Sequence, residues 1–208
     1  MKKSIAIVFV LAFALCNMAG AFAQSEKDFT VRTISGKFTI TKYKGKGGAV
    51  VIPATIGGKP VVEIGNFAFE KCKNITSVTI PAGVTGIGVF AFAVCTGLTS
   101  VSIPAGVISI GDYAFAACTG LTSVSIPAGV TSIKNATFSG CTGLTSVNIP
   151  ASVTSIEASA FAGCTGLTSV SIPASVTRIG MSAFFGCTGL TSVSIGANVA
   201  LGGGGECF

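Results

Sequence analysis

The most informative feature of the chain is a pattern of apolar and polar positions that repeats every 23 residues. It is clearest from Cys95, where the sequence reads CTGLTSVSIPAGVISIGDYAFAA. After each cysteine, Leu or Ile follows at the third place, Val at the sixth, Ile at the eighth, Pro at the ninth, Val at the twelfth, Ile at the fifteenth and Phe at the twentieth. The cysteines in this register are Cys72, Cys95, Cys118, Cys141, Cys164 and Cys187. An earlier unit from Ala49 fits with five extra residues, so we expect about six to seven turns.

Within each unit, the segment Thr-Ser-Val-Ser-Ile alternates polar and apolar side chains. This alternation is typical of a β-strand with one buried face. In the unit that begins at Cys95, we expect Val101 and Ile103 to point inward and Ser100 and Ser102 to point outward. The following proline ends the strand, because it has no N–H group to donate to a β-ladder.

The rest of each unit is expected to complete one turn of a coil. Val107 and Ile110 turn the chain back, and Ala114-Phe115 closes the coil through a short helical turn. A single unit cannot fold alone, because ordering each residue costs about 1–2 kcal/mol while its roughly eight inward side chains return only about 1.5–3 kcal/mol each. Stacked neighbours supply the missing burial. The pattern therefore predicts an all-β-rich parallel solenoid with inward ladders, each rung about 4.8 Å above the last.

The consensus C-x-x-L-x-x-V-x-I-P-x-x-V-x-x-I-x-x-x-A-F resembles the BspA-like, or treponemal-type, leucine-rich repeat over about residues 49–201. The preceding ITKYKGKGGAVVIPATIGGKPVVEIG resembles the segment that often opens such arrays. The resemblance implies a leucine-rich-repeat solenoid, a right-handed parallel β arc with short helical turns, in a bacterial surface or secreted protein. It also implies binding to host matrix glycoproteins, such as fibronectin and fibrinogen, or to other bacteria. The last unit departs from the pattern, with Gly196 in place of Pro and Gly202 in place of Ile, and no surface anchor is visible.

Residues 1–23 have the features of a secretory signal peptide. Lys2 and Lys3 form a basic start, residues 5–16 are apolar, and a small-x-small site precedes cleavage after Ala23. The alternative is a lipoprotein acylated at Cys16, which the bulky residue before that cysteine fits poorly. We therefore expect a secreted, cell-surface or periplasmic protein, with membrane attachment only if Cys16 is lipidated.

Charge separates a basic N-terminal segment from an almost uncharged body. Without the two lysines of the signal peptide, eleven bases face seven acids, a net charge of +4. Residues 24–73 contain nine of these bases and four acids, whereas residues 74–208 contain two bases and three acids. We expect residues 24–48 to form a basic capping segment, residues 49–201 the solenoid and residues 202–208 a Gly-rich tail.

The composition also excludes most catalytic chemistry. The chain has no histidine, which removes Ser-His, Cys-His and His-metal sites at once. Asp28 and Asp112 are the only aspartates, and no pair of acids recurs within one unit. We expect no enzyme activity, no cofactor, no metal and no small-molecule substrate.

The cysteines in register are expected to be small inward hydrophobes with free thiols. Pairing or metal binding is the alternative in an exported protein. Side chains held about 4.8 Å apart exceed the usual Cβ separation of a disulfide, and a linear ladder without histidine offers no tetrahedral zinc site. Cys207 lies outside the register and is expected to be the exposed thiol.

The first candidate site is the row of outward polar positions on the repeated strands. It contains Ser100, Ser102, Ser123, Ser125, Ser146, Asn148, Ser169 and Ser171, beside a threonine column that includes Thr99 and Thr122. Repeat proteins use such extended, regular faces for recognition. The alternative is that the small hydroxyls only keep a repetitive sheet soluble.

The second candidate site is the basic segment with Lys42, Lys44 and Lys46, which suits acidic glycans or anionic surfaces. The alternative is a solvated hairpin turn that blunts the open end of the solenoid, since edge lysines discourage strand addition. Nucleic acid is not expected, because few aromatic residues interleave with the lysines and the chain is exported.

We therefore expect an exported bacterial interaction or adhesion module. It would bind a protein or glycoprotein of the host matrix or a bacterial surface through the strand face. The alternative is a structural or lattice-binding solenoid without a protein partner, in which the regular Thr and Ser columns match ice or a mineral.

Overall fold

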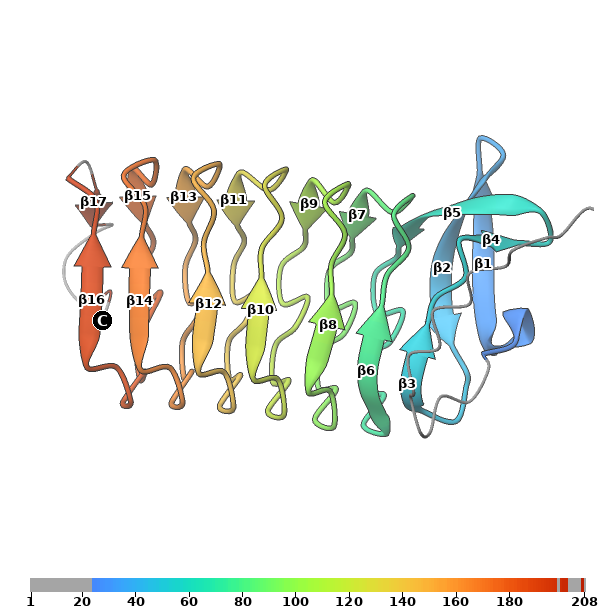
Figure 1. The fold of residues 1–208 in the computed structure, drawn as a ribbon, viewed down its shortest axis with the longest axis horizontal. Coiled ribbons are helices and arrows are strands. Elements are labelled where there is room, and N and C mark those ends of the chain that lie inside the picture. The colour runs from blue at the N-terminus through green and yellow to red at the C-terminus, as the bar shows by residue number, and fades with distance from the viewer. Residues whose placement is uncertain (1–23, 198, 202–206, 208) are drawn as a thin grey trace, which may run out of the picture.

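The computed structural model describes residues 24–197, 199–201 and 207, which form a stack of parallel turns with a hairpin at one end (Figure 1). The parallel β-solenoid expected from the 23-residue repeat is confirmed. The expected signal peptide with its Cys16, and the Gly-rich tail apart from Cys207, lie outside the described residues.

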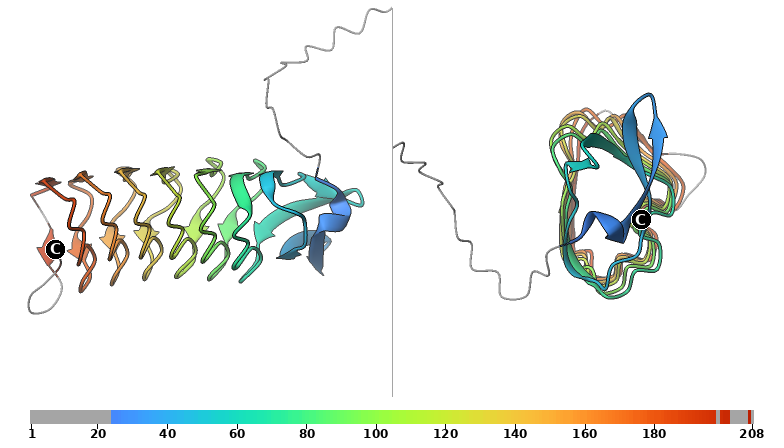
Figure 2. Two further views of the ribbon diagram at one scale, coloured as in Figure 1. Left: turned by 90° about the horizontal axis from the view of Figure 1, so that it is seen from below. Right: turned by 90° about the vertical axis from the view of Figure 1, so that its right-hand side faces the viewer.

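Two columns of short parallel strands run along the solenoid, and an end-on view shows the turns superimposed (Figures 1 and 2). The first column contains β3 (Gly48–Val51), β6 (Ile75–Thr79), β8 (Ser100–Ser102), β10 (Ser123–Ser125), β12 (Ser146–Asn148), β14 (Ser169–Ile172) and β16 (Ser192–Ile195). The second contains β5 (Lys59–Ile64), β7 (Gly86–Ile87), β9 (Ser109–Ile110), β11 (Ser132–Ile133), β13 (Ser155–Ile156), β15 (Arg178–Ile179) and β17 (Ala200–Leu201). Partners lie one repeat apart, as in Ser123 opposite Ser146, so equivalent side chains stack in register.

A hairpin closes the N-terminal end. The 3-10 helix η1 (Glu26–Asp28) leads into β1 (Phe29–Ile34), which pairs antiparallel with β2 (Lys37–Tyr43). Strand β2 then pairs in parallel with β5, and β4 (Thr55–Ile56) adds an antiparallel partner to β5. The hairpin turn lies at Ser35-Gly36, where both φ angles are positive. The alternative placing a hairpin turn around Lys42–Gly48 is therefore wrong, because these residues end β2 and connect it to β3.

Two side-chain ladders fill the core. The phenylalanine ladder is fully buried, and its successive ring centroids lie 4.7–5.6 Å apart. It consists of Phe69, Phe92, Phe115, Phe138, Phe161 and Phe184. Tyr43 stacks on Phe69 at 5.0 Å and ends the ladder beneath the hairpin. Each offset-stacked aromatic pair contributes about 0.5–1.5 kcal/mol of stability beyond that from burying the ring surface.

The cysteine ladder runs beside the rings. The thiol of Cys118 donates to the carbonyl oxygen of Phe92 at 3.1 Å. In the other turns, each thiol donates to the equivalent phenylalanine carbonyl, 26 residues earlier, at 3.0–3.2 Å; these thiols belong to Cys95, Cys141, Cys164 and Cys187. Every described cysteine is free, as the repeat spacing predicts. These thiols thus act as small core residues that also satisfy backbone carbonyls.

The connection expected to be a short helical turn is instead a pair of consecutive β-turns. The N–H groups of Ala114 and Ala116 donate locally to carbonyls three residues earlier, at 3.3 and 3.0 Å. Those of Tyr113, Phe115 and Ala117 donate to the next turn of the solenoid instead, at 2.7–2.9 Å. Tyr113 and Ala117 have φ angles of 56° and 55°, which a right-handed helix cannot contain. Among the described helices, none has the length and apolarity needed to cross a bilayer.

At the C-terminal end, Cys207 is buried, so the expectation of an exposed thiol is wrong. Its carbonyl accepts a hydrogen bond from the N–H of Phe184 at 2.7 Å, as the next turn does elsewhere in the stack. Val193 and Ile195 remain 38% and 44% exposed, although their equivalents Val170 and Ile172 are buried. The difference arises because β16 is the last described strand of its column and lacks a neighbouring strand on one side.

Candidate binding surface

The strand face places the predicted polar residues in two parallel columns. All eight residues are exposed, and they project from β8, β10, β12 and β14: Ser100, Ser102, Ser123, Ser125, Ser146, Asn148, Ser169 and Ser171. Their apolar neighbours, such as Val124 and Val170, point into the core. Within the part of the chain that the structure describes, the side chains of these eight residues make no hydrogen bond to other protein groups. Their donors and acceptors are therefore available to a ligand.

The threonine column has a different role. The hydroxyl of Thr99 donates to the carbonyl oxygen of Thr76 at 2.9 Å, and Thr122 and Thr145 donate to the preceding threonine of the column at 3.3 and 3.1 Å. Thr191 repeats the contact with Thr168 at 3.1 Å. The threonine hydroxyls thus join successive turns, and their protons are already used within the protein.

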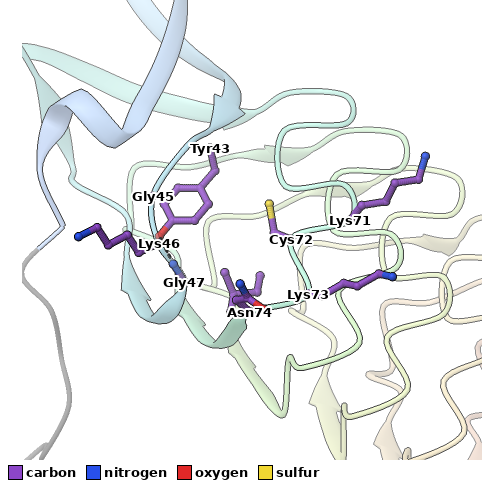
Figure 3. Close-up of a pocket in the computed structure, with 9 residues that line it drawn as sticks. Tyr43, Gly45, Lys46, Gly47, Lys71, Cys72, Lys73 and Asn74 are labelled. Carbon is purple, nitrogen blue, oxygen red and sulfur yellow. Dashed lines mark hydrogen bonds between the residues drawn. The ribbon is translucent and has the colours of Figure 1, made fainter.

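The structure does not bring the predicted lysines onto the strand face. Lys42, Lys44 and Lys46 are exposed at the hairpin end, and only Lys46 lines a pocket of about 320 Å³ there. Lys71 and Lys73 line the same pocket, a grouping that the sequence reasoning missed because they belong to the next turn. Figure 3 shows Lys46 on one side and the other two opposite it, with all three ammonium groups directed away from the pocket. They make a positive end rather than a convergent anion site.

The inner wall of this pocket contains Tyr43 and Cys72 (Figure 3). The Tyr43 hydroxyl donates to Gln24 at 2.9 Å and accepts from the N–H of Gly47 at 3.4 Å, and burial raises the pKa of this phenol. Burial also raises the pKa of the Cys72 thiol to about 11. The thiol is therefore neutral at pH 7, and a neutral thiol is a poor nucleophile.

Comparison with known families agrees with this geometry. The model of the BspA type Leucine rich repeat region matches residues 62–191 in six copies. The chain belongs to this family. No curated protein sequence matches the chain.

Solved structures of leucine-rich repeat proteins share the solenoid. The T. pallidum Leucine Rich Repeat protein TpLRR is 34% identical with a TM-score of 0.82, over 86% of this chain and 85% of that one. A leucine rich cell surface protein from Faecalibacterium prausnitzii is 38% identical with a TM-score of 0.61; the match covers 83% of this chain and about half, 54%, of that protein. A leucine-rich repeat protein from Bacteroides capillosus is 30% identical with a TM-score of 0.51, over 64% of this chain and 99% of that one. The chain is thus a repeat protein of a type found among cell-surface proteins.

This BspA-type chain also has a polar groove beside the second strand column, which the sequence reasoning missed. The groove has a volume of about 540 Å³, and its polar lining includes Glu63, Asn66, Asp112, Lys134, Asn135 and Glu157. A signal was present in the sequence, because the only charged residues between positions 74 and 201 occur 14–17 places after a repeat cysteine. They are Asp112, Lys134, Glu157 and Arg178. The solenoid body thus carries its charge at one phase of the repeat, away from the strand face.

Hydrogen bonds fix the acidic groups of the groove. One carboxylate oxygen of Glu157 accepts from Arg178 at 2.8 Å, Ser155 at 2.9 Å and Ser132 at 3.2 Å. Burial opposes ionisation, but the bonds from Ser155 and Arg178 outweigh it and hold the pKa of Glu157 below its usual value. The carboxylate therefore stays ionised and in place at neutral pH.

Proposed function

We propose that the chain is an exported interaction module that binds a protein or glycoprotein of the host matrix or a bacterial surface through its strand face. The observation that carries the proposal is the set of unengaged polar side chains, from Ser100 to Ser171, that recurs at the same positions on the parallel strands of four successive turns. Membership of the BspA-type family and similarity to a protein described as a cell surface protein support it. The proposal includes no catalytic step.

The physical basis is preorganisation. Each serine hydroxyl can donate and accept, and its backbone is already fixed by the neighbouring turns, so binding orders few additional groups. A single such hydrogen bond contributes only about 0.5–1.5 kcal/mol, so affinity requires many of them across a standard interface of roughly 1,200–2,000 Å². An extended partner surface that covers several turns meets this requirement. Lys42, Lys44 and Lys46 would add long-range attraction for an acidic partner at the hairpin end.

The test uses a partner captured by the mature chain from host matrix or bacterial surface extracts. Replacing Ser102, Ser125 and Ser171 together by Arg places three bulky charges along one column. Affinity for the partner should collapse, whereas stability should change little, because exposed substitutions usually alter it by no more than about 0.5 kcal/mol each. Affinity is measured by surface plasmon resonance and stability by thermal unfolding.

The repeat offers a matched control. Ala105, Ala128 and Ala174 are exposed turn residues three positions beyond those serines, so changing them to Arg adds the same charge to the same turns outside the face. This control should bind normally.

Replacing Lys42, Lys44 and Lys46 by Gln should weaken binding mainly at low salt, because exposed charges are screened over about 10 Å at 0.1 M. If the serine variant binds normally and the lysine variant does not, the basic segment is the site.

A structural or lattice-binding solenoid is the alternative function. It would use the threonine and serine columns together, but the threonine hydroxyls of Thr99, Thr122 and Thr145 already donate to the backbone. This engagement favours the interaction module. Thermal hysteresis of the purified chain would instead support the lattice function.

A further inference from the structure

A second aromatic ladder lies on the outside of the solenoid. The rings of Phe67 and Phe90 stack at 5.4 Å, and those of Phe90 and Tyr113 stack at 4.6 Å with planes 6° apart. Phe67 and Tyr113 are 46% and 41% exposed. The equivalent residues of the next two turns are Ala136 and Ser159, so the ladder ends at Tyr113. Phe90 covers one face of the tyrosine ring, and within the described residues no aromatic ring covers the other.

The polar groove is lined by Asp112, the residue that directly precedes Tyr113 in the chain. The N–H of Tyr113 donates to the carbonyl oxygen of Asn135 at 2.9 Å. One carboxylate oxygen of Asp112, the preceding residue, accepts from the backbone N–H and the side-chain amide of Asn135 at 2.9 and 3.2 Å. Lys134 lines the groove beside them. Among the described contacts, the second oxygen of Asp112 and the ammonium group of Lys134 have no hydrogen-bond or ion-pair partner.

We propose that Tyr113, Asp112 and Lys134 form a binding site for one pyranose ring of a neutral oligosaccharide. A pyranose has an apolar face of C–H groups, which packs on the electron-rich face of an aromatic ring, and a rim of hydroxyls that donate and accept hydrogen bonds. The sugar ring takes the place that an aromatic residue at position 136 would occupy. Its hydroxyls reach the free oxygen of Asp112 and the ammonium group of Lys134.

The charges of the groove favour a neutral sugar over a basic peptide. Glu157 is already paired with Arg178 at 2.8 Å, and Asp112 shares the groove with Lys134. Glu63, further along the groove, accepts from the neutral Thr39 hydroxyl at 2.9 Å, so the lining as a whole keeps one carboxylate in excess, but Asp112 and Lys134 together present both an acceptor and a donor. Hydroxyl groups can satisfy both kinds, whereas a lysine or arginine side chain would meet the charge of Lys134. This site is on a different surface from the strand face and does not rest on its function.

The repeat supplies variants that keep the backbone conformation. Position 136 has φ 49°, and the equivalent Phe90 and Tyr113 have φ 54° and 56°, so its backbone has the conformation that carries an aromatic residue in the preceding turns, although the native Ala136 is only 4% exposed. Ala136→Phe would thus cover the open face of Tyr113. Ser159→Phe adds the same ring one turn further on and leaves that face open. Tyr113→Ser removes the aromatic ring and introduces serine, the residue that position 159 already has at φ 56°.

The test titrates the mature chain with three probes, cellohexaose, chitohexaose and mannohexaose, using isothermal titration calorimetry and saturation-transfer NMR of the sugar protons. At least one probe should bind, and Tyr113→Ser should lower its affinity by about two- to tenfold, the range set by the loss of one aromatic contact. Ala136→Phe should abolish binding, whereas Ser159→Phe should bind as the native chain does. Circular dichroism verifies that each variant is folded.

Two results would overturn the proposal. One is the failure of all three sugars to bind, and the other is a bound sugar whose affinity Ala136→Phe leaves unchanged. A chain with Ser102, Ser125 and Ser171 changed to Arg should still bind the sugar, so the outcome at this groove is independent of the outcome at the strand face.

Discussion

The clearest test of the stacked core is the substitution Phe138→Ala in the middle of the phenylalanine ladder. The Phe138 side chain is fully buried, with Phe115 stacked on one face at 5.6 Å and Phe161 on the other at 5.4 Å. Truncating a buried phenylalanine to alanine costs about 3–5 kcal/mol, because the cavity relaxes only partly. Two ring contacts of about 0.5–1.5 kcal/mol each are lost together, which places this site in the upper part of that range.

Urea unfolding monitored by circular dichroism measures the effect. With a slope of about 2 kcal/mol/M, a loss of about 4–5 kcal/mol lowers the unfolding midpoint by roughly 2–2.5 M. The slope itself should also fall. Each turn contacts only its neighbours, so a defect in the middle uncouples the two halves of the stack.

Phe185→Ala is the matched control, because this phenylalanine, which follows the ladder residue Phe184 in the chain, is 54% exposed. Its substitution should change the unfolding free energy far less, by about 1 kcal/mol or below. If Phe138→Ala costs no more than Phe185→Ala, the ladder does not hold the turns together and the reasoning from stacked rings is refuted.

Two further predictions concern titrating groups. Burial raises the pKa values of Cys72 and Cys141 to about 11 and 12, so alkylation of the native chain at pH 8 should be slow, should reach the half-buried Cys72 first and should accelerate toward pH 11. Under denaturing conditions without reductant, all the repeat cysteines should label, and a disulfide-linked peptide from adjacent turns would contradict the free ladder. Burial raises the pKa of Glu157, but hydrogen bonding outweighs burial and holds this pKa below its unfolded value of about 4.3. The ionised carboxylate therefore stabilises the fold above about pH 4.3, and this contribution is lost as the pH falls through the pKa of the folded state. In urea titrations, the stability difference between the native chain and Glu157→Gln should therefore shrink on acidification, and a difference that grows would show that the bonds to this carboxylate do not stabilise the fold.

The sequence alone was sufficient for the solenoid and its inward ladders. A side-chain pattern that recurs every 23 residues can bury its apolar positions only if equivalent residues stack, as Phe115 stacks between Phe92 and Phe138. The same periodicity predicted that Ser100 and Ser102 face outward and that the repeat cysteines are free. These properties follow from the direction in which each side chain points, which strand alternation encodes locally.

Only the tertiary structure decided the hydrogen-bond partners between turns. The N–H of Tyr113 donates to the carbonyl of Asn135 in the next turn of the solenoid and makes no bond within a helix. The hydroxyl of Thr99 donates to the carbonyl of Thr76 in the preceding turn. Cys207 is buried and its carbonyl accepts from the N–H of Phe184, although Cys207 lies outside the register of the repeat cysteines. The groove containing Asp112 likewise exists only once successive turns are stacked. Local pattern determines which side of the chain is buried, but a hydrogen bond between turns also depends on how closely two segments about one repeat apart approach each other.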